Sequence, residues 1–329
     1  MAAMRVARRN VSLLAALALA CGAPESQNGP DFGKGGGSAP PPPADPAIAY
    51  AVDGHNDQLM VMNADGTNQT SLLTTMMVQS PEWSPGGHQV AFGGGDGTAS
   101  SPAGVYAADV SVVANIPRMS NLRLVIPKFQ LGSPNWSPDG SQLVVTGIVE
   151  DGSAGIATVP AAGGALTVRF SASLPADGLN PFVPSFSGAS WSPDGTRLAF
   201  TYGEHYHLSH DTSTLLVLTL ATGHIDTLYN ATPTSGLQQV LRPDWSPDGT
   251  RIVFDGYAAA TDQRQLYTVP AVPGSQPRAL PGTTGGSGAH WSPDGGQLVY
   301  TGAGVRLYTL QSGSSTLLSR VGNSVDWRR

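Results

Sequence analysis

The sequence predicts an all-β fold, a six-bladed β-propeller of four-stranded antiparallel blades. Two observations predict it. A phrase that reads Trp-Ser-Pro-Asp-Gly, or Trp-Ser-Pro-Gly-Gly in its first copy, recurs along the chain, and a sixth tryptophan ends an incomplete copy at the C-terminus. These tryptophans are 36 to 55 residues apart, a spacing typical of repeat architectures, and they are Trp83, Trp136, Trp191, Trp245, Trp291 and Trp327. The chain also contains 41 Gly and 27 Pro in 329 residues, as expected where many strands are joined by tight turns.

Each copy follows one plan of four strands. The tryptophan ends a first strand, and Ser-Pro-Asp-Gly forms a turn in which Pro presets φ and Gly accepts a positive φ. An alternating apolar run follows as the second strand, for example residues 197–202 (RLAFTY). Residues 215–218 (LLVL) and 226–228 (DTL) then exemplify the third and fourth strands. Four antiparallel strands with alternating side chains make one propeller blade.

The two ends of the repeat region predict how the ring closes. Residues 47–54 (AIAYAVDG) match a second strand, and residues 57–73 supply a third and a fourth. The missing first strand is the C-terminal segment 324–327 (SVDW). Its pairing with the N-terminal blade completes a sixth blade and leaves no open sheet edge. The alternative, an open solenoid, would leave three N-terminal strands without a partner.

The repeat resembles that of the TolB-type, WD40-like β-propeller family, whose blades carry Trp-Ser-Pro-Asp-Gly before an apolar strand. The match covers about residues 48–329. The resemblance implies an envelope protein that binds other proteins or ligands. TolB proteins also have a separate α/β domain ahead of the propeller, and no counterpart of it is expected here. Partner contacts made through that domain are therefore not implied.

Residues 1–20 are predicted to be a signal peptide, with a basic start and the apolar stretch 11–20. Ten apolar residues are too few to span a bilayer as a helix. Residues 17–21 (LALAC) resemble a bacterial lipobox, although Ala18 stands where Leu is usual. We therefore expect Cys21, the single cysteine, to be lipidated. An ordinary secretory signal with a chance cysteine is the alternative.

Residues 21–47 are rich in Gly and Pro and are predicted to be a flexible tether between the lipid anchor and the propeller, residues 48–329. The sequence thus predicts an exported, membrane-anchored lipoprotein, on the periplasmic face or at the outer membrane, with a monomeric propeller. Removal of the three arginines of the signal leaves 14 basic and 23 acidic residues, a formal charge of −9. Because this charge repels phosphate backbones, nucleic acid is not expected as a partner.

Long connections are predicted on the face opposite the Ser-Pro-Asp-Gly turns. We expect ligands to bind there, since variable loops on a rigid scaffold usually carry binding residues. The predicted long connections are 93–104, 171–189, 202–213, 230–243 and 281–289. We call this side of the propeller the long-loop face.

Two groups of residues are candidate sites. His205, His207 and His210 lie with two carboxylates in residues 204–211 and could ligate zinc, although a solvated polar loop is the alternative. The second group is the residue before each tryptophan, polar in every copy: Glu82, Asn135, Ser190, Asp244, His290 and Asp326. We expect these side chains to ring the central channel, where they either bind a cation or small polar ligand or line a wet channel.

Known catalytic motifs, including the nucleophile elbow, the phosphate-binding loop, the dinucleotide fingerprint and the EF-hand loop, are not found. The sequence therefore predicts a non-enzymatic, lipid-anchored scaffold without a cofactor. Its partner would be an envelope protein or a cell-wall or polysaccharide component. The alternatives are a metal-dependent propeller enzyme, such as a polysaccharide lyase or hydrolase, and a small-ligand sensor that uses the channel. The oligogalacturonate-lyase-like propellers, which are metal enzymes, resemble a seven-bladed ring, whereas six blades are predicted here.

Overall fold

The structure, a computed structural model, describes residues 46–52, 58–95, 98–99, 102–127, 133–148, 153–172, 182–206, 212–261 and 263–328. The chain divides into two units. Met1–Pro41 lies outside the described residues, as do Cys21 and nearly all of the predicted tether. Pro42–Arg329 contains every described strand. In the described ranges no helix is long and apolar enough to cross a membrane.

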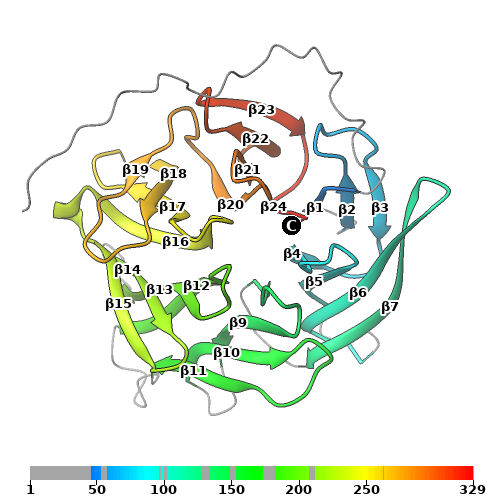
Figure 1. The fold of residues 1–329 in the computed structure, drawn as a ribbon, viewed down its shortest axis with the longest axis horizontal. Coiled ribbons are helices and arrows are strands. Elements are labelled where there is room, and N and C mark those ends of the chain that lie inside the picture. Colours follow the sequence, from blue (N-terminus) through cyan, green and yellow to red (C-terminus); the bar gives the residue numbers. More distant parts are fainter. Residues whose placement is uncertain are drawn as a thin grey trace, which may run out of the picture. The chain divides into compact units, whose positions relative to one another are not determined.

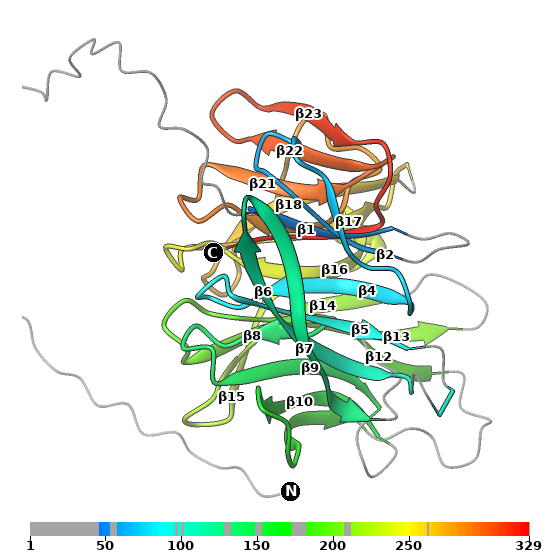
Figure 2. The same ribbon diagram turned by 90° about the vertical axis from the view of Figure 1, so that its right-hand side faces the viewer.

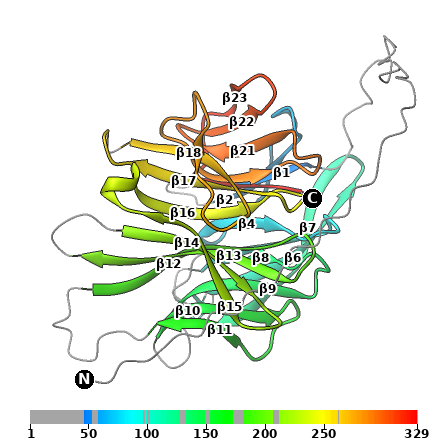
Figure 3. The same ribbon diagram turned by 60° about the vertical axis from the view of Figure 1, so that its left-hand side comes forward.

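The described residues form six antiparallel sheets of four strands each, arranged around a central axis (Figure 1). This confirms the predicted six-bladed propeller. Seen from the side, the strands run through the thickness of the ring (Figures 2 and 3). A single short 3₁₀ turn, η1 (Pro233–Ser235), is the helical element among the described residues.

The blades are numbered along the chain, and the strands of each are given from the axis outward. Blade 1 contains β24 (Ser324–Trp327), β1 (Ile48–Val52), β2 (Gln58–Met62) and β3 (Thr70–Leu73). Blade 2 contains β4 (Val78–Trp83), β5 (Gln89–Gly94), β6 (Gly104–Val113) and β7 (Ile116–Pro127). Blade 3 contains β8 (Asn135–Trp136), β9 (Gln142–Ile148), β10 (Ala154–Pro160) and β11 (Thr167–Ala172).

The second half of the ring follows the same order. Blade 4 contains β12 (Phe182–Trp191), β13 (Arg197–Tyr206), β14 (Thr212–Thr219) and β15 (His224–Ala231). Blade 5 contains β16 (Leu237–Trp245), β17 (Arg251–Ala258), β18 (Gln263–Pro270) and β19 (Arg278–Ala279). Blade 6 contains β20 (Ser287–Trp291), β21 (Gln297–Thr301), β22 (Val305–Thr309) and β23 (Ser314–Ser319).

The ring closes as the sequence predicts. Strand β24 pairs antiparallel with β1, with Trp327 opposite Ile48 and Ser324 opposite Ala51. The C-terminal strand therefore supplies the innermost strand of the N-terminal blade, near the axis (Figure 1). Backbone hydrogen bonds extend this pairing at both ends, from Asn323 N to Ala51 O and from Arg328 N to Ala47 O. The pairing gives β1 a partner on the side that an open solenoid would leave exposed.

The hydrophobic core lies between the blades, not within them. The described residues contain six buried clusters, and each joins side chains of two neighbouring blades. Each repeat tryptophan belongs to the cluster that its blade shares with the preceding one; Trp245, for example, packs with Leu215 and Leu228 of blade 4. Trp327 packs likewise with Val299 and Val305 of blade 6. The tryptophan thus recurs because each blade must bury one flat face against its neighbour.

Several predicted long connections are wrong in extent, because strands occupy part of them. Strand β12 begins at Phe182, within the predicted connection 171–189. Strand β16 likewise begins at Leu237, within 230–243. These first strands look irregular in sequence because a β-bulge before the tryptophan interrupts the alternation of side chains.

Candidate functional site

The six residues before the tryptophans form a ring around the channel, as predicted; we call them the channel ring. Each lies on the innermost strand of its own blade, so every blade contributes one side chain. Four consecutive blades, 5, 6, 1 and 2, contribute titratable groups, and blades 3 and 4 contribute an amide and a hydroxyl. In that order the members are Asp244, His290, Asp326, Glu82, Asn135 and Ser190. The ring therefore has a charged half and a neutral half.

Several channel-ring side chains hold the neighbouring blade by its backbone. Asp326 Oδ2 accepts a hydrogen bond from the backbone N–H of Trp83 at 2.7 Å. Asn135, Ser190 and Asp244 do the same for the tryptophan of the next blade, at 3.2, 3.3 and 3.2 Å respectively. These bonds satisfy buried backbone donors that would otherwise be costly. Part of the polarity of the ring is thus explained by assembly of the blades.

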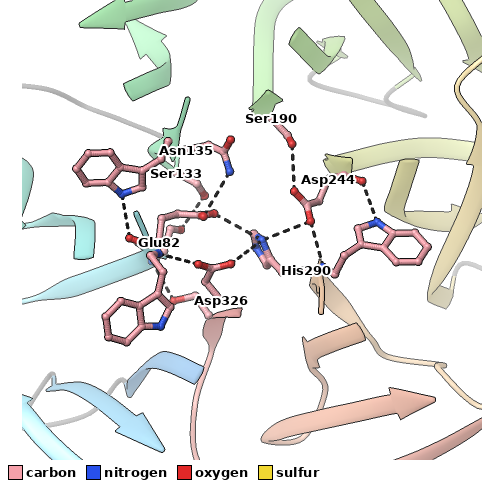
Figure 4. Close-up of polar contacts among 12 residues, drawn as sticks. Glu82, Ser133, Asn135, Ser190, Asp244, His290 and Asp326 are labelled. Carbon is pink, nitrogen blue, oxygen red and sulfur yellow. Dashed lines mark hydrogen bonds and ion pairs between the residues drawn. The ribbon is translucent and has the colours of Figure 1, made fainter. Parts of the chain in front are cut away.

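The charged half converges on one imidazole nitrogen (Figure 4). His290 Nδ1 lies 3.2 Å from Asp326 Oδ1, 3.6 Å from Glu82 Oε1 and 3.9 Å from Asp244 Oδ2. The three carboxylate side chains are almost fully enclosed, with 2%, 6% and 2% of their surface exposed, and His290 is 18% exposed. Glu82, His290 and Asp326 each place one donor atom within 4.8 Å of the other two. Of the described residues, these three are the group able to hold a metal ion together.

The channel opens to pockets of different character on its two faces. The pocket toward the long-loop face has a volume of about 170 Å³ and is lined mainly by hydroxyl and amide groups, with Glu82, His290 and Arg242. The pocket on the other face has a volume of about 250 Å³ and is lined largely by tryptophans and by the prolines of Ser-Pro-Asp-Gly turns. Both volumes are below the roughly 300–1,000 Å³ of most small-molecule sites. They suit an ion with its waters, or one inserted side chain, better than an oligosaccharide.

The rim of the first pocket carries a fixed cation. Arg242 donates to buried Asp255 at 2.9 Å and to Ser287 Oγ at 2.6 Å. The Asp255 carboxylate raises the pKa of Arg242 above its ordinary value. Arg242 therefore stays charged and is held in one position at the mouth of the pocket.

This rim was not predicted from the sequence, although the aligned repeats contain a signal for it. Arg242 stands three residues before its tryptophan, where Ser80, Ser133 and Ser324 also line the pocket. Ser80 and Arg242 both have φ of +48°, a conformation uncommon for residues other than Gly. It follows from the bulges in β4 and β16, which turn these residues into the mouth. Extending the alignment two residues upstream of the channel ring would have identified the rim.

The structure does not describe the side chains of the predicted histidine group, His205, His207 and His210. His205 lies on strand β13, but its side chain is outside the described part of the structure. His207 and His210 fall outside the described residues altogether. Their role as ligands stays a prediction.

No protein-family profile and no curated protein matches the sequence. Among solved structures, TolB from Acinetobacter baumannii is similar at a TM-score of 0.62 and 17% identity, over 86% of this chain and 66% of that one. A protein assigned as TolB from Agrobacterium tumefaciens is similar at a TM-score of 0.56 and 18% identity, over 87% and 99% of the two chains. The chain has a TolB-like propeller fold.

The same fold occurs in an enzyme. The periplasmic gluconolactonase of Pseudomonas aeruginosa is similar at a TM-score of 0.52 and 13% identity, over 86% of this chain and 99% of that one. This chain also spans 66% of the length of the Acinetobacter TolB. The TolB-like fold therefore does not distinguish a binding protein from an enzyme. The function has to be inferred from the geometry and chemistry of the site.

Proposed function

We propose that the protein is a non-enzymatic, lipid-anchored scaffold of the cell envelope that binds an envelope protein or a polysaccharide through the long-loop face. Cys21 would carry the lipid, and residues 21–47 would hold the propeller away from the membrane. The proposal agrees with the similarity to TolB structures, one of which this chain matches over 99% of that protein's length.

The observation that carries the proposal is the pocket on the long-loop face. Its lining comes from the innermost strands of five blades, or from the residues next to them, so a bound group would contact most of the ring. The lining combines hydroxyls, amides and the fixed cation of Arg242, which can donate hydrogen bonds to peptide carbonyls, carboxylates or sugar hydroxyls. A pocket of about 170 Å³ suits a single protruding side chain, a chain end or one sugar of a larger partner. The rest of such a partner would lie on the surrounding loops.

Site-specific crosslinking in cells tests this function. A photo-reactive residue at exposed Asn323, on the rim of the pocket, is expected to crosslink to an envelope component. The matched control is Thr250, an exposed residue in a turn on the opposite face. Crosslinks from Thr250 but not from Asn323 would place the partner on the wrong face, and absence of crosslinks at either position would argue against a scaffold.

A small-ligand sensor is the second candidate, and the convergence of His290, Asp326 and Glu82 favours it. A sensor would bind its ligand in the purified state, with no second macromolecule present. Thermal unfolding in the presence of sugars, amines and carboxylates separates this candidate from the scaffold. A rise in melting temperature that is lost in Arg242→Gln would favour the sensor.

A further inference from the structure

We infer that the charged half of the channel ring is a binding site for a divalent transition-metal ion of the zinc class. The ligands are His290 Nδ1, Asp326 Oδ1 and Glu82 Oε1, from blades 6, 1 and 2. The remaining coordination positions are filled by water from the pocket on the long-loop face, which Glu82 and His290 both line. This inference is independent of the partner proposed above.

The distances from the His290 nitrogen to the two carboxylate oxygens fit an ion between them. Zinc binds nitrogen and carboxylate oxygen at roughly 2.0–2.2 Å, so two ligands of a tetrahedral site are about 3.4 Å apart. His290 Nδ1 lies 3.2 Å from Asp326 Oδ1 and 3.6 Å from Glu82 Oε1. Both distances agree with that edge to within about 0.2 Å.

The imidazole nitrogen itself points to a ligand. His290 Nδ1 is enclosed and has no hydrogen-bond partner among the described residues, although carboxylate oxygens of three residues surround it. A protonated ring with an aligned N–H would instead donate to one of these oxygens. An enclosed imidazole nitrogen with carboxylate oxygens around it is an arrangement typical of metal ligands.

Hydrogen bonds fix each carboxylate in the orientation that the ion requires. Asp326 uses Oδ2 to accept from Trp83 N, which leaves Oδ1 directed at His290 (Figure 4). Glu82 uses Oε2 to accept from Asn135 Nδ2 at 3.3 Å, which leaves Oε1 directed at the same nitrogen. Such outer contacts are the usual means of holding metal ligands in place. Asp244, whose Oδ1 accepts from Ser190 Oγ, adds negative charge at 3.9 Å from His290.

The number of buried carboxylates also favours a bound cation. As whole residues, Glu82, Asp244 and Asp326 are 4%, 1% and 1% exposed. Buried carboxylates are costly unless a positive charge compensates them. Arg242 is the one Lys or Arg among the residues that line the adjoining pocket, and it is paired with Asp255. A divalent ion at the convergence point offsets two of these three negative charges. Because one ligand is an imidazole, an ion of the zinc class suits the set better than Ca²⁺ or Mg²⁺, which prefer oxygen ligands alone.

Metal titration of the purified protein tests the inference. After removal of metal by chelation, Zn²⁺ is titrated by calorimetry, with Mn²⁺, Ca²⁺ and Mg²⁺ in parallel. We expect one Zn²⁺ per chain and a higher melting temperature on binding. In Asp326→Asn, which keeps an acceptor for Trp83 N, and in His290→Gln, Zn²⁺ affinity should fall by about 100-fold or more.

Two control variants identify the histidines responsible. His224→Gln alters an exposed histidine that pairs with Asp226 on the outer surface, and the triple variant His205→Gln, His207→Gln, His210→Gln removes the predicted loop group. Both should bind Zn²⁺ as the unaltered protein does. Absence of stoichiometric Zn²⁺ binding, loss of binding in the triple variant alone, or binding of Ca²⁺ without Zn²⁺ would overturn the inference.

A spectroscopic measurement covers the case in which His290→Gln does not fold. Co²⁺ added to the unaltered protein should give visible absorption bands typical of a mixed nitrogen and oxygen ligand set, and Zn²⁺ should abolish them. The same bands should persist in the triple loop variant. Their absence from the unaltered protein, or their loss in that variant, would equally refute the site.

Discussion

The first repeat copy departs from the other four in a way that yields a quantitative prediction. It reads Trp-Ser-Pro-Gly-Gly, so Gly86 stands where the later copies have Asp. The backbone of the turn is nevertheless the same: Gly87 N donates to Ser84 O at 2.7 Å, and Gly87 has φ of +64°. The corresponding values in the third copy are 2.9 Å and +70°, at Gly195. We therefore expect Gly86→Asp to stabilise the protein.

The size of the effect follows from a turn that already has the aspartate. Asp294 accepts hydrogen bonds from Ser292 Oγ at 2.6 Å and from Gly296 N at 2.9 Å. A carboxylate that caps a backbone N–H in this way is worth about 1 kcal/mol, and replacing Gly at a position with ordinary φ adds about 0.4–1 kcal/mol through the unfolded chain. A Cβ at Gly86 would have as its nearest neighbour His88 Cδ2 at 3.7 Å, which is ordinary contact. The total, about 1.4–2 kcal/mol, corresponds to a rise in melting temperature of roughly 2–4 °C, because a propeller of about 280 residues has an unfolding entropy of about 0.6 kcal/mol/K.

Thermal unfolding by calorimetry and circular dichroism checks this value, and Gly86→Ala is the matched control. Alanine supplies the change in the unfolded chain without the hydrogen bonds, so it should give less than half of the rise. Asp294→Gly should lower the melting temperature by a similar amount to the gain in Gly86→Asp. A melting temperature of Gly86→Asp at or below that of Gly86→Ala would refute the hydrogen-bond argument.

Three further predictions concern closure, acid stability and anchoring. Trp327→Ala should lower the free energy of unfolding by about 3–5 kcal/mol in denaturant titrations, because it leaves a cavity in the hydrophobic cluster between blades 6 and 1. Hydrogen bonds from serine side chains lower the pKa values of the turn carboxylates, here Asp139, Asp194, Asp248 and Asp294. Their stabilisation should therefore be complete above about pH 4 and lost as the pH falls through the lowered pKa values, and replacing all four by Asn should flatten an acid titration in that range. Cys21→Ser should release the protein from membranes and prevent incorporation of labelled fatty acid; unchanged fractionation would contradict the lipid anchor.

The fold was predictable because the repeated tryptophan is the residue that packs each blade against the preceding one. Every blade needs a large flat side chain at one position to cover the preceding blade, so tryptophan recurs there and can be counted. Closure of the ring was predictable for the same reason. Trp327 ends a first strand that has no second strand after it, and the N-terminal blade has no first strand of its own. The lengths of the inner strands were not predictable. In β12 and β16 a bulge before the tryptophan interrupts the usual alternation of buried and exposed residues.

The membership of the channel ring could be predicted, but the contacts within it could not. Alignment places Glu82 and His290 at equivalent positions two blades apart, and nothing in the sequence says that their side chains approach to 3.6 Å. That distance depends on the radius of the channel, which is set by packing between blades. Arg242 was not predicted because the residues at the equivalent positions of the other blades are serines and glycines. Its fixed position at the pocket depends on the ion pair with Asp255, which only the structure shows.

The channel ring also shows how one repeated position can serve assembly and binding together. Where the side chain accepts the N–H of the next tryptophan, as Asn135 and Ser190 do, a short neutral group is sufficient. Asp326 accepts the same bond with one oxygen and has a second oxygen left for His290. A carboxylate costs more to bury than an amide or a hydroxyl, so assembly alone does not explain why three carboxylates gather around one imidazole. The excess negative charge on one half of the ring is the property that a bound cation would account for.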